Sequence, residues 1–218
     1  MCELSLADFK HIVTPELLAQ LIQPEAPING LVPKVFGFRG ITFNGNLGDF
    51  ASARDAVDIV EYVAEHGVPV HINTNGSLRN TDWWARLALP GVTVGFAIDG
   101  MSDTHKLYRQ DTDWHKIITN AKAFIAAGGH AIWRFVPFDH NRDQQDECKK
   151  LSREMGFARF ENIYDGRDRG PVFDRGGEFS HHIGPVYGPA DQIPNVRPML
   201  ESHITWYDSQ TFRSEKDT

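Results

Sequence analysis

Short apolar runs and longer segments of helical period alternate along most of the chain. The runs VPVHINT, VTVGFAID and AIWRFVPF are rich in β-branched and aromatic residues and predict buried strands. Segments 51–67 and 113–129 carry apolar residues at three- and four-residue spacing and end at glycine, which is typical of helices. About five such alternations favour parallel strands, because each crossover helix returns the chain to the same sheet edge. The pattern therefore predicts an α/β fold, either an open sheet or a barrel.

Two helices and a strand are predicted before the first full alternation. The segment SLAD at residues 5–8 has the pattern of a capping box, and Thr14 followed by Pro15 marks the start of a second helix. After a Pro/Gly-rich loop, the run from about Val35 to Phe43 predicts the first strand.

The C-terminal part has a different character. FARFENI predicts one more strand, and Asn141 with Gln144 is predicted to cap the helix before it. From Tyr164 to Pro198 the chain is rich in Gly, Pro, Arg and Asp and shows no period, as expected of a long loop, a lid or an extension. We therefore predict a barrel-like domain over residues 1–162 and an irregular extension over residues 163–218.

Composition narrows the class of protein. With 41% hydrophobic and 23% charged residues, the 218-residue chain is typical of a soluble domain, and it has no apolar run of membrane-spanning length. The 22 Lys and Arg are dispersed and the net charge is -7, which argues against a nucleic-acid partner. The start MCELSLADFK lacks the features of a secretory signal, and Cys2 and Cys148 give no disulfide framework, so a cytoplasmic location is expected.

Three predicted loops at the carboxyl ends of strands share one chemistry, and ligands of parallel α/β folds bind at such ends. Residues 45–49, 74–76 and 99–100 each combine glycine with a short polar side chain. Glycine lets backbone approach a ligand closely, and exposed carbonyls with one carboxylate suit an ammonium group. The polar side chains of the other two loops have the size to hold hydroxyls or an amide. The alternative is that these residues only build tight turns and helix caps.

The histidine and tryptophan residues give little further evidence about function. His181 and His182 lie near Asp174 and Glu178, but their spacing matches no known ligand pattern, so no metal site is predicted. Trp83, Trp84, Trp114 and Trp133 are interpreted as packing residues of the core rather than as a stacking platform, and Cys148 as a small core residue.

The order of GNLGD, HINTNGSLRN with DWW, FAIDGMSDTHKLYR and WRFVPFDHN resembles the barrel of the radical S-adenosylmethionine (radical SAM) superfamily, in the branch related to SPASM-type enzymes. The resemblance covers residues 43–161 and implies a partial parallel (β/α)6 barrel that binds S-adenosylmethionine. The first loop matches the family's GGE motif, so the resemblance implies that it contacts the methionine amino group of the cofactor. The resemblance also implies that the second loop lies along the cofactor and that two further residues lie near its ribose or carboxylate. The implied binding residues are Gly45, Asn46, Gly48 and Asp49, then Thr74, Asn75 and Gly76, then Asp99 and Arg134.

One part of the family pattern is missing. Members carry a CxxxCxxC loop whose three thiolates hold a [4Fe–4S] cluster, and Cys2 and Cys148 cannot replace it. The segment ELSLADFKHIVTPELL resembles the stretch that members carry directly after that loop, so we expect the chain to begin just downstream of it and to end where a cysteine-bearing extension would start. No catalytic residue is assigned, and radical chemistry is not expected of this chain alone.

The leading hypothesis is thus a truncated or split radical SAM protein that keeps the cofactor loops and modifies an unknown substrate, a peptide or protein being one class that the family implies. A second hypothesis is a non-catalytic barrel without a cluster that binds a peptide or another partner. A third is an unrelated α/β barrel that binds a phosphorylated metabolite at the same loops.

Overall fold

The computed structural model describes residues 5–22, 40–45, 48–164, 168–173 and 176–185. The chain divides into two compact units, the first formed by residues 1–135 with 141–162 and the second by residues 136–140 with 163–218. The domain boundary after residue 162 stays a prediction. No helix in the described ranges is long and apolar enough to cross a membrane.

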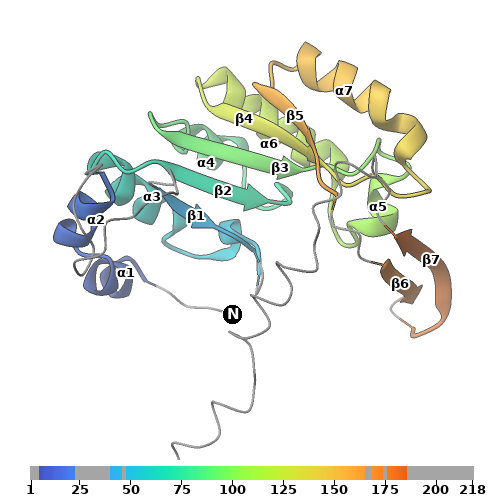
Figure 1. The fold of residues 1–218 in the computed structure, drawn as a ribbon, viewed down its shortest axis with the longest axis horizontal. Coiled ribbons are helices and arrows are strands. Elements are labelled where there is room, and N and C mark those ends of the chain that lie inside the picture. Colours follow the sequence, from blue (N-terminus) through green and yellow to red (C-terminus); the bar gives the residue numbers. More distant parts are fainter. Residues whose placement is uncertain (1–4, 23–39, 46–47, 165–167, 174–175, 186–218) are drawn as a thin grey trace, which may run out of the picture. The chain divides into compact units, whose positions relative to one another are not determined.

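A five-stranded parallel sheet forms the centre of the first unit (Figure 1). Its strands are adjacent in the order of the sequence, so each pairs with the next through a crossover. The strands are β1 (Ile41–Phe43), β2 (Val70–Thr74), β3 (Val92–Ala97), β4 (His130–Phe135) and β5 (Arg159–Asn162). The predicted α/β class and partial parallel barrel are confirmed, with five parallel strands in the described ranges. Of the predicted first strand, residues 35–39 lie outside those ranges.

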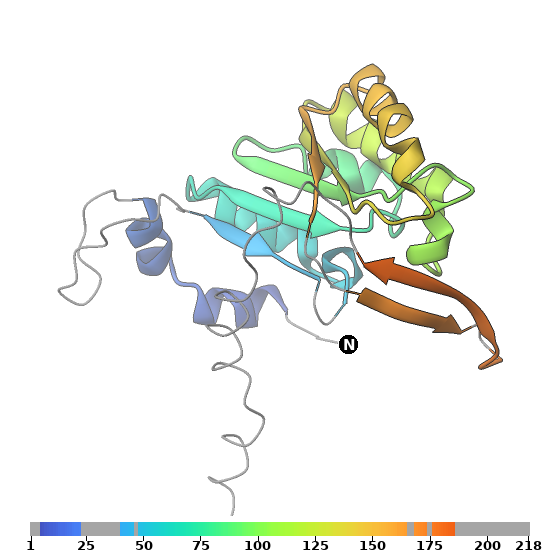
Figure 2. The ribbon, with the colours of Figure 1, turned by 45° about the vertical axis from the view of Figure 1, so that its right-hand side comes forward.

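Helices precede and connect these strands (Figures 1 and 2). The capping box predicted at residues 5–8 is present, since Asp8 N–H donates to Ser5 Oγ at 3.1 Å, and Leu17 N–H donates to Thr14 Oγ1 at 3.3 Å. The elements are α1 (Leu6–Ile12), α2 (Pro15–Ile22), η1 (Phe50–Ser52), α3 (Ala56–Glu65), α4 (Thr81–Arg86), α5 (His105–Tyr108), α6 (Trp114–Ala126), η2 (Arg142–Gln144) and α7 (Gln145–Glu154), where η marks a 3-10 helix.

The two faces of the sheet differ in polarity. On β2, Val70, Ile72 and Thr74 are buried while His71 and Asn73 are only half-buried, which is the alternation of a strand with one covered face. The apolar side forms the core with the helices, where Trp84 and Trp133 are fully buried, as predicted for core residues. The other side, called the open face below, carries the polar side chains of His71, Asn73 and Arg134 together with the buried Ile132.

The second unit contains an antiparallel hairpin of β6 (Asp168–Phe173) and β7 (Phe179–Pro185). The sequence interpretation of this stretch as a loop without regular structure was wrong here. The hairpin was missed because Gly170 and Pro171 interrupt the alternation that marks a strand, and a bulge between Val172 and Phe173 shifts its register.

Candidate functional site

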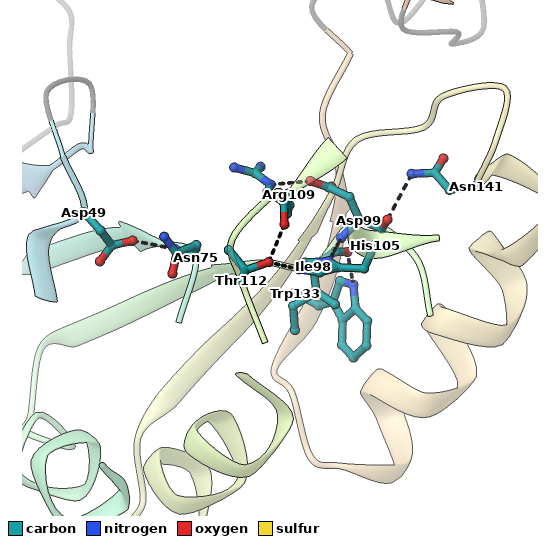
Figure 3. Close-up of polar contacts among 9 residues, drawn as sticks. All are labelled: Asp49, Asn75, Ile98, Asp99, His105, Arg109, Thr112, Trp133 and Asn141. Atoms are coloured by element: carbon teal, nitrogen blue, oxygen red, sulfur yellow. Dashed lines mark hydrogen bonds and ion pairs between the residues drawn. The ribbon is translucent and has the colours of Figure 1, made fainter. Parts of the chain in front are cut away.

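Asp49 joins the first two loops at the carboxyl edge of the sheet. Its Oδ1 accepts the N–H of Ala51 at 3.0 Å and so caps η1. The same carboxylate accepts the hydroxyl of Thr74, with Oγ1 2.9 Å from Oδ1, and the N–H of Asn75, 2.7 Å from Oδ2 (Figure 3). The loop after β1 is therefore fixed to the end of β2 through one carboxylate.

Arg79 makes a second connection between the same loops. Its Nε donates to the carbonyl of Ala51 at 2.7 Å and its Nη2 to the carbonyl of Ala53 at 2.8 Å. Gly76 completes the turn with φ 73°, where a Cβ would lie 2.8 Å from the ring of Phe96. Only glycine fits that position without moving the core.

Asp99 lies at the end of β3, and its side chain is fully buried. Its Oδ2 accepts Nε of Arg109 at 2.6 Å, forming an ion pair (Figure 3). Burial is the largest single influence on Arg109 and opposes its charge, but Asp99, Tyr108 and Asp49 together outweigh it, and the pKa of Arg109 is raised. A carboxylate without solvent contact needs such a partner to stay charged.

Side chains hold the backbone around Asp99. The carbonyl of Ile98 accepts Nε1 of Trp133 at 2.9 Å, and that of Asp99 accepts Nδ2 of Asn141 at 3.2 Å. The carbonyl of Gly100 accepts Nε1 of Trp114 at 3.1 Å. Three successive carbonyls thus have side-chain donors.

The prediction that Asn141 and Gln144 cap α7 was wrong. Asn141 and Gln144 stand at the N-cap positions of η2 and α7, but neither makes a side-chain cap hydrogen bond, and Nδ2 of Asn141 donates to the carbonyl of Asp99 instead. Gln144 instead accepts the N–H of Met101 at 2.8 Å through Oε1.

His105 completes a ring of hydrogen bonds beside the ion pair of Asp99 and Arg109. Its Nδ1 accepts the N–H of Asp99 at 3.1 Å, so the ring proton of the neutral imidazole lies on Nε2, 3.1 Å from Oγ1 of Thr112. Thr112 donates in turn to the carbonyl of Arg109 at 2.6 Å. Burial lowers the pKa of His105 to about 4, so this imidazole is neutral at physiological pH.

Arg134 lies on the open face of the sheet, on β4. Its Nη1 donates to Oδ1 of Asn73 on β2, crossing the intervening strand β3. The crossing is possible because β3 has Gly95 there, where a Cβ would lie 2.7 Å from Cδ of Arg134. Glu161 on β5 is 3.8 Å from Nε of Arg134, an ion-pair distance too long for a hydrogen bond.

The structure brings some predicted site residues together and separates others. Thr74 and Asn75 meet at Asp49, and the N–H of Gly76 lies 2.9 Å from Thr74 Oγ1. Gly45 and Gly48 are exposed in the first loop, whereas Asn46 lies outside the described residues. Asp99 follows β3 and Arg134 lies on the neighbouring strand β4, and they bind different partners, Arg109 and Asn73.

Sequence reasoning missed Arg109, His105 and Asn73. Arg109 and His105 stand in the segment DGMSDTHKLYR after β3, and the ten-residue distance from Asp99 gives no helical or strand period that would link them. The position of Asn73 could have been predicted from strand alternation, because it directly precedes Thr74 and its side chain therefore lies on the opposite face of the sheet.

No group of three or more His, Cys, Asp or Glu residues in the described ranges is placed to hold a metal ion. Cys148 is fully buried on α7, 3.7 Å from the sulfur of Met101, and burial raises its pKa to about 12. Because cluster iron binds thiolates, Cys148 does not fit the role of a [4Fe–4S] ligand, and the two cysteines of the chain are fewer than the three required.

Comparison with known proteins supports the fold. No protein-family model matches the chain, and neither does any curated protein sequence. Among solved structures, SuiB of Streptococcus suis matches with a TM-score of 0.50 and 20% identity, over 75% of this chain and 35% of SuiB. SuiB bound to S-adenosylmethionine matches with a TM-score of 0.50 and 20% identity, over 75% of this chain and 36% of that one.

A second protein gives the same result. Native anSMEcpe with bound AdoMet and Kp18Cys peptide matches with a TM-score of 0.50 and 16% identity, over 79% of this chain and 46% of that one. The match therefore spans less than half the length of either protein. These likenesses show the fold alone, and they confirm the partial parallel α/β barrel that the sequence resemblance implied.

Proposed function

We propose that this chain is a radical SAM-type barrel that binds S-adenosylmethionine at the carboxyl ends of β1 to β4. The observation that carries the proposal is the joining of two glycine-containing loops by Asp49, which places a carboxylate and bare backbone at one edge of the sheet. SuiB and anSMEcpe, whose solved structures hold this cofactor, share the fold.

The charge of Asp49 supports an ammonium ligand. Its oxygens accept the hydrogen bonds of Ala51, Thr74 and Asn75, none of which carries a charge. No lysine or arginine in the described ranges lies within ion-pair distance of Asp49, although the charges of Arg109 and Asp49 attract each other from farther apart. The amino group of S-adenosylmethionine would supply a direct cationic partner, and a charge-assisted hydrogen bond is among the stronger contacts available.

The remaining predicted residues are assigned by position. Asn75 and Gly76 follow Asp49 along the edge and suit contact with the length of the cofactor, while Asp99 and Arg134 suit its ribose or carboxylate. Radical modification of a substrate is proposed only together with a cluster whose cysteines this chain does not contain, so no chemical step is assigned to its residues.

The substrate class proposed is a peptide or protein. SuiB has been solved with its precursor peptide SuiA, at a TM-score of 0.50 and 19% identity over 76% of this chain and 35% of that one. The polar open face of the sheet, with Asn73 and Arg134, offers donors and acceptors of the kind that a peptide backbone uses.

Calorimetric titration with S-adenosylmethionine tests the proposal. The wild-type chain is expected to bind, and Asp49→Asn is expected to weaken binding by about 1–3 kcal/mol, the usual loss for a hydrogen bond to a charged group. Asp82→Asn, an exposed carboxylate on α4, is the matched control and should bind as the wild type does. A folded wild-type sample that gives no binding heat would contradict the proposal.

Ligand binding by the cluster-free protein separates this function from the non-catalytic alternative. Anaerobic reconstitution with iron and sulfide should leave this chain colourless, because its cysteines do not suffice for a cluster. Binding of S-adenosylmethionine by that colourless protein supports the cofactor site. Binding of peptide without the cofactor would favour a partner-binding module instead.

A further inference from the structure

We propose that Asn44 is the site of a spontaneous modification, in which its side-chain amide is converted to a carboxylate through a cyclic imide formed with Gly45. The reaction needs one water molecule and no further reactant. Asn44 has no role in the family resemblance, and its assignment follows from contacts in this structure.

The reaction is an internal acyl transfer. The main-chain nitrogen of Gly45 bonds to Cγ of Asn44, the bond from Cγ to Nδ2 breaks, and ammonia leaves with the hydrogen of the attacking nitrogen. Water then opens the ring. Opening at Cγ gives aspartate, and opening at the main-chain carbonyl carbon gives isoaspartate, in which the chain runs through the former side chain. Glycine favours ring closure because it has no side chain to hinder the approach of Cγ.

The nitrogen of Gly45 is available for this attack. Asn44 and Gly45 are both exposed, so water reaches the amide and can take up the proton of the nitrogen. Among the described residues, no acceptor lies within hydrogen-bond distance of the Gly45 N–H. Ring closure at this position therefore breaks no hydrogen bond of the attacking nitrogen.

Asn73 on β2 polarises the amide that is attacked. Its Nδ2 donates to Oδ1 of Asn44 at 2.5 Å. Negative charge develops on that oxygen while the ring closes, and a donor already in place stabilises such charge. The amide of Asn73 is oriented from its other side, where Oδ1 accepts Nη1 of Arg134 and lies 3.0 Å from Nε2 of His71. Because a guanidinium can only donate, the oxygen faces Arg134 and Nδ2 faces Asn44.

A second Asn-Gly pair lies in the same site and is protected. Gly76 is buried, and its N–H donates to Oγ1 of Thr74 at 2.9 Å, so the corresponding nitrogen is engaged. Oδ1 of Asn75 accepts the N–H and the hydroxyl of Ser77, each at 2.9 Å, which fixes that side chain. The fold thus leaves one Asn-Gly pair open and closes the other. A third pair, at residues 29–30, lies outside the described residues.

The modification changes the start of the loop that carries Asp49. Asn44 directly follows β1, and isoaspartate adds one carbon to the main chain at this point. The added length displaces the loop relative to Thr74 and Asn75, which Asp49 has to reach. Under the proposed function, on which this consequence alone rests, the unliganded site loses affinity for S-adenosylmethionine with time.

Peptide mapping by mass spectrometry tests the site. The folded chain is incubated without cofactor at mildly alkaline pH, a second sample is incubated in concentrated urea, and conversion at residues 44 and 75 is followed with time. In urea both residues should react. In the folded chain Asn44 should react at least as fast as in urea, whereas Asn75 should be slowed by about tenfold or more, because its reaction has to break the Gly76 hydrogen bond. Protection of Asn44 as strong as that of Asn75 overturns the proposal.

Asn73→Asp tests the role of the donor. Aspartate keeps an acceptor for Arg134 but offers no N–H to Asn44, so the reaction should slow by about three- to tenfold, less than in a buried oxyanion hole because water can replace the donor here. Thr42→Ala, exposed on β1, is the control that should keep the wild-type rate. Protection of Asn75 shows that each variant is folded, and Asn73→Ala replaces Asn73→Asp if that protection is lost. An unchanged rate in the folded variant contradicts the assistance by Asn73.

Calorimetry on the separated forms tests the consequence for the site. Ion exchange isolates the isoaspartyl form, which a protein isoaspartyl methyltransferase identifies, and this form should have lost most of the affinity for S-adenosylmethionine that the unmodified chain shows. Equal affinity of the two forms overturns the effect on the site. If the unmodified chain does not bind the cofactor either, the proposed function fails, while the mapping of residues 44 and 75 still decides the modification.

Discussion

The N–H of Asn75 donates to Oδ2 of Asp49 across 2.7 Å, and this bond joins the loop after β1 to the loop after β2. The same carboxylate caps η1 through Ala51. Asp49 therefore stabilises the two loops in the absence of a ligand. Its effects on stability and on ligand binding have to be measured separately.

Replacing Asp49 with alanine is expected to reduce the free energy of unfolding by about 1–3 kcal/mol, because the N–H groups of Asn75 and Ala51 lose their acceptor. Urea denaturation measures the loss, and hydrogen exchange at the Asn75 amide should become faster. Asp82→Ala on α4 should leave exchange at Asn75 unchanged and lower the stability by less than about 1 kcal/mol, the usual effect of an acidic residue in the first turn of a helix. Unaltered stability together with unaltered exchange at Asn75 would show that the two loops are held by other contacts.

His105 makes stability depend on pH. Its pKa is lowered to about 4 in the folded chain, against about 6.5 for an unperturbed histidine, so between these values the unfolded state binds the extra proton. Its contribution is complete above pH 6.5 and is lost as the pH falls toward 4. The slope attributable to this residue approaches about 1.4 kcal/mol per pH unit within that window.

The comparison that isolates this effect uses His105→Asn, whose Oδ1 can accept the Asp99 N–H but does not titrate. Unfolding free energies of both proteins are measured from pH 4 to pH 7. The difference between them should vary with pH in the window, since titration of His71 and the carboxylates is common to both proteins. A constant difference would mean that His105 titrates normally in the folded state.

Gly95→Ala should disturb the open face of the sheet. The added methyl group would lie 2.7 Å from Cδ of Arg134 and 2.9 Å from Oδ1 of Asn73, so these side chains have to move and their hydrogen bond is expected to weaken. A stability loss of about 1–3 kcal/mol is expected, as for other insertions into packed sites. Chemical denaturation measures it, with Thr42→Ala, exposed on the same face of β1, as the control. If the variant keeps full stability and the Arg134 Nε–H signal does not move, the Arg134 side chain does not cross β3 at Gly95 to reach Asn73.

Cys148 should resist thiol reagents in the folded protein. It is fully buried and its pKa is raised to about 12, so very little thiolate is present at pH 8. In a Cys2→Ser background, labelling by an aromatic disulfide reagent should proceed only as fast as the chain unfolds, and urea should accelerate it. Rapid labelling without denaturant would show that α7 opens locally.

The strand and helix pattern was predictable because burial on one face imposes a period on the sequence. The alternation in VHINT gives β2 its covered and open faces, and apolar spacing in 113–129 gives α6. The meeting of Asp49 with Thr74 and Asn75 follows from the same logic, since parallel strands end at one edge. The family roles of these residues stay predictions.

The contacts around Asp99 were less accessible to prediction. Arg109 directly follows the short helix α5, whose four residues leave no periodic signal. Asn141 was assigned to a helix cap because its local sequence suits one. In both cases a long-range hydrogen bond decides the outcome. Local patterns contain no information on such partners.

The three side-chain donors on the carbonyls of Ile98, Asp99 and Gly100 come from Trp133, Asn141 and Trp114, which belong to separate segments of the fold. The loop after β3 is therefore held in one conformation, so its backbone loses little conformational entropy when a ligand binds. Recognition at this loop should depend on the fit of the ligand to a preset shape, and molecules that require the loop to adapt should be rejected.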